Sequence, residues 1–444
     1  ILQLETLVDK TGNILIRKEA SSGLENRKTV VLQAHLDMVP QKNSTKVHNF
    51  EKDPIEPVIK GEWVGANGTT LGADNGIGAA AIMAILESNE IEHGPIEALF
   101  TIDEETGMTG AFNISQDFLK GDILLNTDSE VEGELYIGSA GGIDYTAMFE
   151  WLRNPVDKDS KSFQVSLTGL RGGHSGMDIN LERGNANKLV IRFLWNASKK
   201  YKIKLSSLSG GDLRNAIPRE CFARFTVPIE HVNSLRDYMN HYFFILKNEL
   251  QNTEPDLQLK MNEIDSVKDV LDENVQRSFL HSLYACQHGV VRVTTEMPEV
   301  PETSLNLAAI NFRDNNIIVQ FLLRSSVDSA KESLADSLDA LFELGGAKIQ
   351  RSGSYPGWKP DLDSEILQVM KRVYLQLYGK NPGIKIVHAG FETGVIGEKY
   401  PNLDMISFGP TIKHPHSPDE KVHIPSVQKF WDFLKETLKN IPVK

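Results

Sequence analysis

Residues 96–111 read IEALFTIDEETGMTGA, an apolar stretch that runs into two adjacent acids, Glu104 and Glu105, and then a glycine-containing turn. The apolar part is typical of a buried strand. Adjacent like charges repel each other and are costly to desolvate, so they do not stabilise an ordinary strand end. A metal site does gain, because one carboxylate can bind the ion while its neighbour moves a proton. Taken alone, the pair is better explained by a solvated loop.

Other segments in the first third of the chain predict an alternation of strands and helices. Residues 13–18, 29–38 and 122–128 are mostly apolar and predict strands. Residues 75–88, NGIGAAAIMAILES, predict a helix with Asp74 and Asn75 at its cap. In open α/β sheets, ligands bind at the carboxyl ends of the strands, which is where the polar residues of these segments lie.

The chain of 444 residues is too long for a single compact core, which predicts two or three domains. The pattern changes near Gly142 and again near Tyr355. We therefore expect an α/β domain made of residues 1–141 and 355–444, interrupted by an inserted α+β domain at 142–354. The order of elements inside the insertion repeats loosely, which favours two similar halves.

Composition narrows the class of protein. The net charge of −13 disfavours nucleic acid and anionic membranes as partners, and no apolar run approaches the ~20 residues that span a bilayer. Cys221 and Cys286 lie in apolar stretches without metal-like spacing, so we expect reduced thiols and a cytoplasmic location. The chain begins at Ile1 without Met or a secretory leader, so we also expect a further N-terminal piece.

Several acids and one histidine fall where the predicted elements begin or end. His35 and Asp37 are two residues apart in the strand VVLQAHLDMVP, so both side chains should leave the same face. Asp74 opens the predicted helix, where a simple N-cap is the alternative. Asp128 ends the strand at 122–128, where the alternative is a solvated loop.

A second histidine comes from the loop HPHSPDE at 414–420, and spacing alone leaves His414 and His416 as rivals for this place. Three carboxylates and two imidazoles, without sulfur, suit zinc, with manganese and cobalt as alternatives. Two ions about 3.5–4 Å apart need a bridging carboxylate between them. The second carboxylate of the Glu104–Glu105 pair would then be free to act as a general base.

Six motifs, in this order and spacing, resemble those of the co-catalytic zinc exopeptidases of the aminoacylase, peptidase T and carnosinase superfamily. They are HLDMVP, GADNGIG, DEETG, NTDSE, GGHSGMD and HSPDE, and the resemblance covers essentially the whole chain. It implies an α/β catalytic domain with a central mixed sheet flanked by helices, interrupted by an inserted α+β lid domain.

The resemblance also implies roles for the residues of the first domain. One zinc would be bound by His35, Asp74 and Asp128, and the other by Asp74, Glu105 and His416, with Asp74 bridging. The histidine of the HSP motif thereby selects His416 over His414. Glu104 would be the base, Asp37 would orient His35, and relatives often have a cis peptide where this chain has Asp74–Asn75.

In the insertion, the resemblance implies that His174 of GGHSG stabilises the oxyanion and that Asn215, Arg324 and Gly390 contact the substrate. A polar loop histidine and a surface ion pair are the alternatives for His174 and Arg324. Relatives often have Leu and Cys where this chain has Phe391 and Thr393, which leaves the shape of the pocket open.

The implied activity is that of a dizinc metallo-dipeptidase, with Xaa-His peptides, including carnosine-like ones, as the expected substrates. Alternatives are another exopeptidase or deacylase of the superfamily, such as a tripeptidase or an N-acyl amino acid deacylase, and a non-catalytic peptide-binding homologue. The chain has every expected ligand and the base, which argues against the last. A homodimer is the expected assembly, with His174 supplied from either the same chain or the partner.

Overall fold

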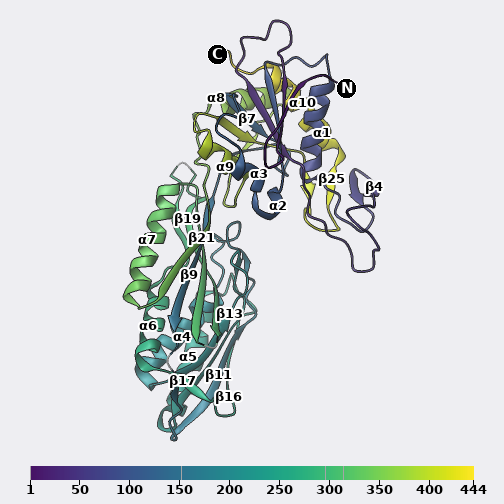
Figure 1. The fold of residues 1–444 in the computed structure, drawn as a ribbon. Helices are drawn as coiled ribbons and strands as arrows, with labels where there is room; N and C mark the ends of the chain where they lie inside the picture. Colours follow the sequence, from purple (N-terminus) through teal and green to yellow (C-terminus); the bar gives the residue numbers. More distant parts are fainter. Residues whose placement is uncertain (1, 152, 296, 314) are drawn as a thin grey trace. The chain divides into compact units, whose positions relative to one another are not determined.

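The structure is a computed structural model that describes residues 2–151, 153–295, 297–313 and 315–444. The chain divides into two compact units (Figure 1). Unit 1 comprises residues 1–139, 358–387 and 391–444, and unit 2 comprises residues 140–357 and 388–390. Each unit is described by itself.

Unit 1 is built on a mixed eight-stranded sheet. Its inner strands β6, β3, β7 and β23 run parallel to one another, whereas β2 pairs with β6, and β8 with β23, in the antiparallel direction. The strands in sheet order are β1 (Glu5–Val8), β2 (Ile14–Lys18), β6 (Ile96–Thr101), β3 (Val30–His35), β7 (Ile123–Asn126), β23 (Asp404–Ser407), β8 (Glu134–Ser139) and β22 (Gly383–Val387).

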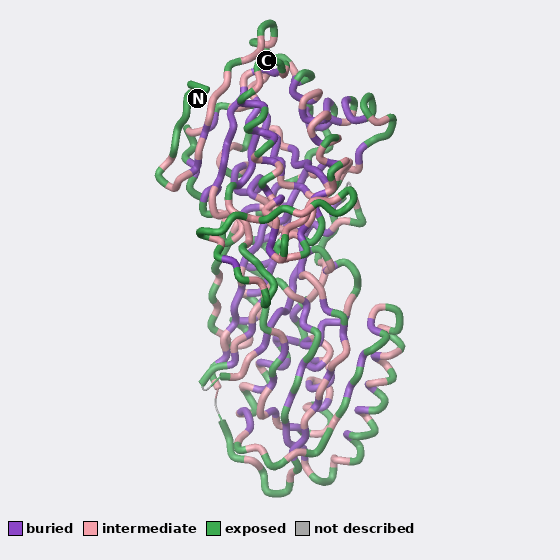
Figure 2. Tube along the Cα trace, turned by 90° about the vertical axis from the view of Figure 1, so that its right-hand side faces the viewer, coloured by how far each residue is buried: buried purple, intermediate pink, exposed green. Residues whose placement is uncertain are grey.

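Helices cover both faces of this sheet. Apolar residues of α1 (Ala73–Glu87), α8 (Glu365–Tyr378) and α10 (Ile424–Lys439) form one core with residues such as Leu32 and Leu125. The opposite face, including Val31 and Leu124, packs against α3 (Thr109–Asn113) and α9 (Glu392–Lys399). The inner strands are therefore buried on both sides, as Figure 2 shows near the two termini, and this explains why they read as continuous apolar runs.

A small antiparallel sheet lies beside the start of α1 in the same unit. Its strands, in order, are β24 (Ile412–Lys413), β25 (Lys421–His423), β5 (Trp63–Ala66) and β4 (Pro57–Lys60). Ile412 and Val422 of this sheet pack against Ala73, the first residue of α1. The turn between β24 and β25, which carries His416, is thereby held beside the beginning of α1.

Unit 2 contains a nine-stranded antiparallel sheet. Eight strands follow one path, β16 (Gln258–Glu263), β11 (Ser160–Thr168), β15 (Cys221–Pro228), β13 (Lys204–Gly210), β19 (Pro301–Arg313), β20 (Asn316–Ser325), β9 (Gly141–Glu150) and β21 (Lys348–Tyr355), and β18 (Gly289–Val293) pairs with β19. Four helices share one core with this sheet: α4 (Ala186–Tyr201), α5 (Val232–Glu249), α6 (Glu273–Ala285) and α7 (Asp328–Leu344).

Shorter elements complete unit 2. They are the strand pairs β10 (Arg153–Pro155) with β17 (Asp269–Leu271) and β12 (Gly173–His174) with β14 (Ala216–Ile217), and the 3₁₀ turn η1 (Ile229–His231). Both cysteines are free and buried. Among the described residues, none of the helices is long and apolar enough to cross a membrane.

Residues His388–Gly390 belong to unit 2, although the segments directly before and after them in the sequence belong to unit 1. The Ala140 amide donates to the Ala389 carbonyl at 3.0 Å, and His388 Nε2 lies 2.8 Å from the Ser304 hydroxyl. His388 is 4% exposed. Burial, followed by repulsion from Arg324, lowers the pKa of His388 to about 3.

We expect this histidine to make folding pH-dependent. An unfolded chain takes up a proton at His388 near pH 6.5, whereas the folded chain does so only near pH 3, so stability falls as the pH drops through this window. Between pH 7 and pH 5 the loss from one such group is about 2 kcal/mol. In His388→Gln, the thermal midpoint should therefore fall less between these pH values than it does in the parent. The exposed His241 supplies a control, His241→Gln, and an unchanged pH response in His388→Gln contradicts the expectation.

Candidate metal centre

The carboxyl ends of three neighbouring parallel strands bring the site residues to one edge of the unit 1 sheet. His35 is the last residue of β3, and Asp128 follows β7 by two residues. Glu104 and Glu105 begin α2 (Glu104–Gly107), a single helical turn just after β6. Asp74 lies at the start of α1, and His416 lies between β24 and β25.

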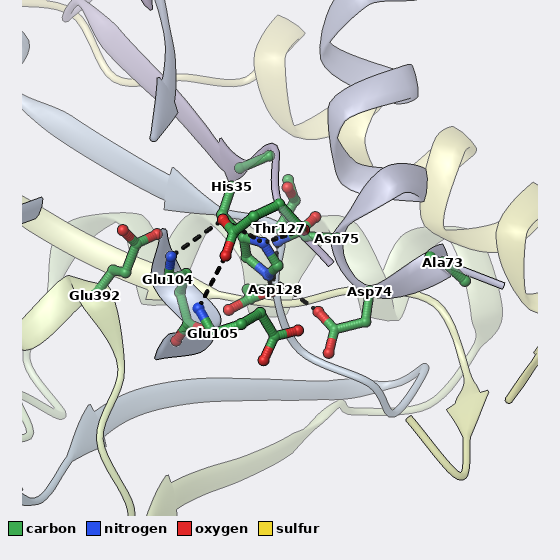
Figure 3. Close-up of polar contacts among 12 residues, drawn as sticks. His35, Ala73, Asp74, Asn75, Glu104, Glu105, Thr127, Asp128 and Glu392 are labelled. Carbon is green, nitrogen blue, oxygen red and sulfur yellow. Dashed lines mark hydrogen bonds and ion pairs between the residues drawn. The ribbon is translucent and has the colours of Figure 1, made fainter. Parts of the chain in front are cut away.

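The side chains of these residues converge, and Figure 3 shows Asp74 on the α1 side of Asp128. His35 Nε2 lies 3.1 Å from both Asp74 Oδ1 and Asp128 Oδ1. The other oxygen of Asp74, Oδ2, lies 3.2 Å from His416 Nε2, which is itself 3.0 Å from Glu105 Oε2. The two oxygens of one carboxylate thus face two separate donor groups.

Among the described residues, three groups of donor atoms lie close enough together to hold a cation. They are His35–Asp74–Asp128, Asp74–Glu105–His416 and His35–Glu104–Glu105. The first two share Asp74. His414 belongs to none of the groups found among the described residues, so the geometry brings together His416 rather than its rival.

The expectation that Asp37 shares a strand face with His35 is wrong. Strand β3 ends at His35, and Asp37 lies in the irregular segment that follows it. The Asp37 carboxylate instead accepts the amides of Glu104 and Glu105, each at 3.1 Å. His35 Nδ1 lies 3.0 Å from the Asp37 backbone carbonyl and 3.6 Å from its carboxylate. Asp37 therefore anchors both acids and lies against the His35 ring.

The expectation that Asp74 and Asn75 cap α1 is also wrong. The N-cap is Gly72, in a left-handed conformation (φ 75°), and no side chain of the segment caps the helix. Asp74 and Asn75 have non-helical backbone angles, and the peptide between them is cis. Asn75 Nδ2 donates to Asp128 Oδ1 at 2.5 Å, so it fixes a site carboxylate.

A glycine lets α1 approach the site this closely. A Cβ at Gly78 would lie 2.1 Å from Asn75 Oδ1 and 2.2 Å from Thr127 Oγ1. Any larger residue would push the helix away from the end of β7 or displace Asn75.

The charged groups of this cluster favour the presence of a positive charge among them. Burial raises the pKa of Glu104 to about 9, and repulsion by neighbouring acids, first Asp128, adds to this shift. Burial likewise raises the pKa of Asp128 to about 6. Contacts with Asp74 and Glu105 raise the pKa of His416 to about 10. The repulsion between the acids and the raised pKa of His416 are signs of a negative potential at the cluster.

Two buried carboxylates of the site region were not singled out from the sequence. Glu392 Oε2 accepts from Gln33 Nε2 and Thr101 Oγ1, both at 2.7 Å, and burial raises its pKa to about 7. It lies on the far side of Glu104 from the other acids in Figure 3. Glu420 accepts hydrogen bonds from backbone amides at the beginning of α1. Both residues stand in motifs that the sequence does show, HAGFETG and HSPDE, but their partners are far away along the chain.

The donor set fits divalent cations. It combines imidazole nitrogens and carboxylate oxygens, which zinc, manganese and cobalt accept. Glu105 Oε1 is buried and has no hydrogen-bond partner among the described residues, as expected of an oxygen meant for another ligand. Asp74 faces a donor group with each of its oxygens, as a bridging ligand must.

In unit 2, backbone contacts fix the protonation of His174. Its Nδ1 accepts the amides of Gly176 at 3.1 Å and Met177 at 3.0 Å. Burial, with repulsion from Arg324, lowers the pKa of His174. The ring is therefore neutral near pH 7 with its proton on Nε2, which makes Nε2 a hydrogen-bond donor.

The other predicted residues of unit 2 have different surroundings. Asn215 is exposed, and its carbonyl accepts from Ser175, the neighbour of His174, at 2.8 Å. Arg324 is 5% exposed. It donates to the Tyr355 hydroxyl at 2.9 Å, while its Nε is buried without a partner among the described residues. Gly390 follows Ala389, whose carbonyl is held by Ala140.

Asn306 of unit 2 was not predicted. It is buried on β19, and its Nδ2 donates to the carbonyls of Arg214 at 3.0 Å and Ala216 at 2.8 Å, on either side of Asn215. An asparagine within a buried strand carries no distinctive sequence signal, because its role depends on a loop some 90 residues away.

Comparison with known proteins gives the family. The family described as Peptidase family M20/M25/M40 matches residues 31–440. The chain belongs to this peptidase family. The superfamily predicted from the six motifs and the predicted fold class are thereby confirmed.

Relatives of this M20 peptidase match it over almost its whole length. The cytosol non-specific dipeptidase of Escherichia coli (strain K12) is 49% identical over 436 residues, which is 98% of this chain and 90% of that protein. The crystal structure of aminoacylhistidine dipeptidase from Vibrio alginolyticus has a TM-score of 0.96 at 50% identity, covering 99% of this chain and 90% of that one. Aminopeptidase PepT from Bacillus cereus, with a TM-score of 0.56 at 15% identity and coverage of 99% and 89%, shares the fold.

Proposed function

We propose that this M20 peptidase hydrolyses unblocked dipeptides, with those ending in histidine among its substrates. The observation that carries the proposal is the convergence of two cation-binding groups on the shared carboxylate Asp74, with Glu104 beside them. The two similar relatives support the substrate class, since one is named a non-specific dipeptidase and the other an aminoacylhistidine dipeptidase.

The family is metal-dependent, and zinc is the proposed metal of this chain. We assign His35, Asp74 and Asp128 to one ion and Asp74, Glu105 and His416 to the other. When bound, the ions would supply Lewis acidity, an activated water and a positive charge that favours the ionised form of nearby carboxyls. Manganese and cobalt suit the same donors.

Within this centre Glu104 is the proposed proton carrier. Its amide is fixed by Asp37, and its carboxyl group is held among acids in a largely buried place. Glu104 would accept the proton of the attacking water and then deliver it to the amine that leaves. Asp37 would act through others, by holding Glu104, Glu105 and the His35 ring in place.

Residues of unit 2 are proposed to bind the substrate. His174 would donate from Nε2 to the carbonyl oxygen of the scissile bond as negative charge develops there. Arg324, with its unpartnered Nε, would hold the terminal carboxylate of the dipeptide. Asn215 and Gly390 would contact the substrate through the side-chain amide and the backbone.

A panel of four substrates tests this function. The zinc-loaded protein is offered Ala-His, carnosine, a tripeptide and an N-acetyl amino acid, and release of free amino acid is measured. We expect hydrolysis of Ala-His, with little or none of the other two, because the N-acetyl compound lacks a free amine and the two termini of the tripeptide are one residue further apart than those of a dipeptide. Cleavage of the N-acetyl amino acid alone would make the protein a deacylase, and no cleavage of any substrate would leave only peptide binding.

A cytoplasmic location and a homodimer are proposed for the whole protein. The name of the Escherichia coli relative includes the cytosol, and both cysteines are free. Light scattering of the purified protein gives the number of chains directly.

A further inference from the structure

We propose that Glu420 is a positioning residue of the metal centre, which sets the shared ligand Asp74 and the ligand His416 in one fixed arrangement. The inference rests on the proposed function, because it assumes that cations bind at Asp74. It concerns a residue outside both ligand sets, which acts on them through the backbone alone.

The Glu420 carboxylate accepts hydrogen bonds from four consecutive backbone amides. Oε2 accepts from Leu71 at 2.7 Å and Gly72 at 3.0 Å, while Oε1 accepts from Ala73 at 2.7 Å and Asp74 at 3.3 Å. Glu420 is 3% exposed. A buried carboxylate requires compensation of this kind, and charge-assisted hydrogen bonds to amides are among the strong ones.

Within the described part of the chain, these amides have no hydrogen-bond partner in their own segment. The N-cap of α1 provides no side-chain hydrogen bond, and the following Asp74 and Asn75 are not helical. The first amides of a helix otherwise need a cap from their own segment. Glu420 supplies this cap from 346 residues away along the chain, and its last bond ends at the amide of Asp74 itself.

Glu420 is equally tied to the second ligand. Its amide donates to the Ser417 carbonyl at 3.0 Å, and the Asp419 amide donates to Ser417 Oγ at 3.1 Å, which closes the turn directly after His416. The His416 side chain is 51% exposed, so packing does little to hold it. The backbone segments that carry Asp74 and His416 are therefore joined through one buried side chain.

The test replaces the carboxylate by an amide of the same shape. In Glu420→Gln, the NH₂ group faces backbone N–H groups and two acceptor contacts are lost. Zinc affinity, measured by competition of the metal-free protein with a chromophoric chelator, should fall about 10- to 100-fold, as for other residues that support metal ligands. Glu420→Asp keeps the charge with a shorter reach and should lie between this variant and the parent.

Glu97→Gln is a matched control. Glu97 is 2% exposed and also accepts two backbone amides, from Lys120 at 2.7 Å and Gly121 at 3.0 Å, but it lies at the amino end of β6, away from the ligands. We expect it to lower the thermal midpoint of the metal-free protein while zinc affinity stays as in the parent.

Each outcome decides the question. Parental zinc affinity in Glu420→Gln, or an equal loss of affinity in Glu97→Gln, overturns the positioning role while the proposed function stands. A parent protein that binds no zinc overturns both. If Glu420→Gln does not fold, the affinity of Glu420→Asp takes its place, and a parental value there overturns the role.

Discussion

Glu104→Gln should abolish most turnover while the protein keeps its metal. The change removes the proton acceptor but retains the shape of the side chain, and loss of a general base costs about 100- to 10,000-fold in rate. Glu104 stands outside the two donor groups that share Asp74, so zinc content should remain at the parental level. The measurements are kcat on Ala-His and zinc per chain by elemental analysis.

The neighbouring acid provides a matched control for this variant. Glu105 lies 3.0 Å from His416 and has a buried oxygen without a partner, so Glu105→Gln should lose zinc as well as activity. Added zinc should restore part of the activity of Glu105→Gln and none of the activity of Glu104→Gln. A zinc-replete Glu104→Gln protein with near-parental kcat would disprove its assignment as base.

His174→Ala should lower kcat about 100- to 1,000-fold, which is typical of removing one preorganised donor to an oxyanion. The backbone amides of Gly176 and Met177 hold the ring so that Nε2 carries the proton. The effect should fall on kcat rather than on zinc content, since His174 is absent from the ligand groups found among the described residues.

The conservative substitution His174→Gln distinguishes loss of the hydrogen-bond donor from a folding defect at this position. His174→Gln retains a side-chain N–H donor and should recover part of the rate lost in His174→Ala. His241→Ala removes an exposed histidine of α5 and should leave kcat unchanged. Parental kcat in His174→Ala would show that His174 is only a structural loop residue.

The sequence predicted the elements that frame the site well, because the strands of unit 1 are buried on both faces. Strands β3, β6 and β7 are uninterrupted apolar runs, and their ends could be located from the polar residues that follow. The long strands β9 and β19 of unit 2 were not predicted, although both lie in the middle of a sheet. Buried polar residues such as Asn306 break their apolar pattern.

Candidate ligand positions could be named from motifs, but the residues that support them could not. Asp37 was expected on a strand face, yet its carboxylate accepts hydrogen bonds from the backbone amides of Glu104 and Glu105, which lie 67 and 68 residues away. Asp74 was expected to cap a helix that is instead capped by Glu420. In both cases a side chain satisfies backbone groups of a distant segment, and no local pattern in a single sequence records such a pairing.

The position of β23 in the sheet sets the order in which this protein can assemble during synthesis. Strand β23, at residues 404–407, lies between β7 and β8, which leave the ribosome hundreds of residues earlier. The sheet of unit 1 therefore stays open until residue 407 has emerged, whereas most of unit 2 is one uninterrupted stretch that can fold first. Of the residues in the two donor groups that share Asp74, His416 is made last, so the nascent chain cannot assemble both groups before residue 416 has been added.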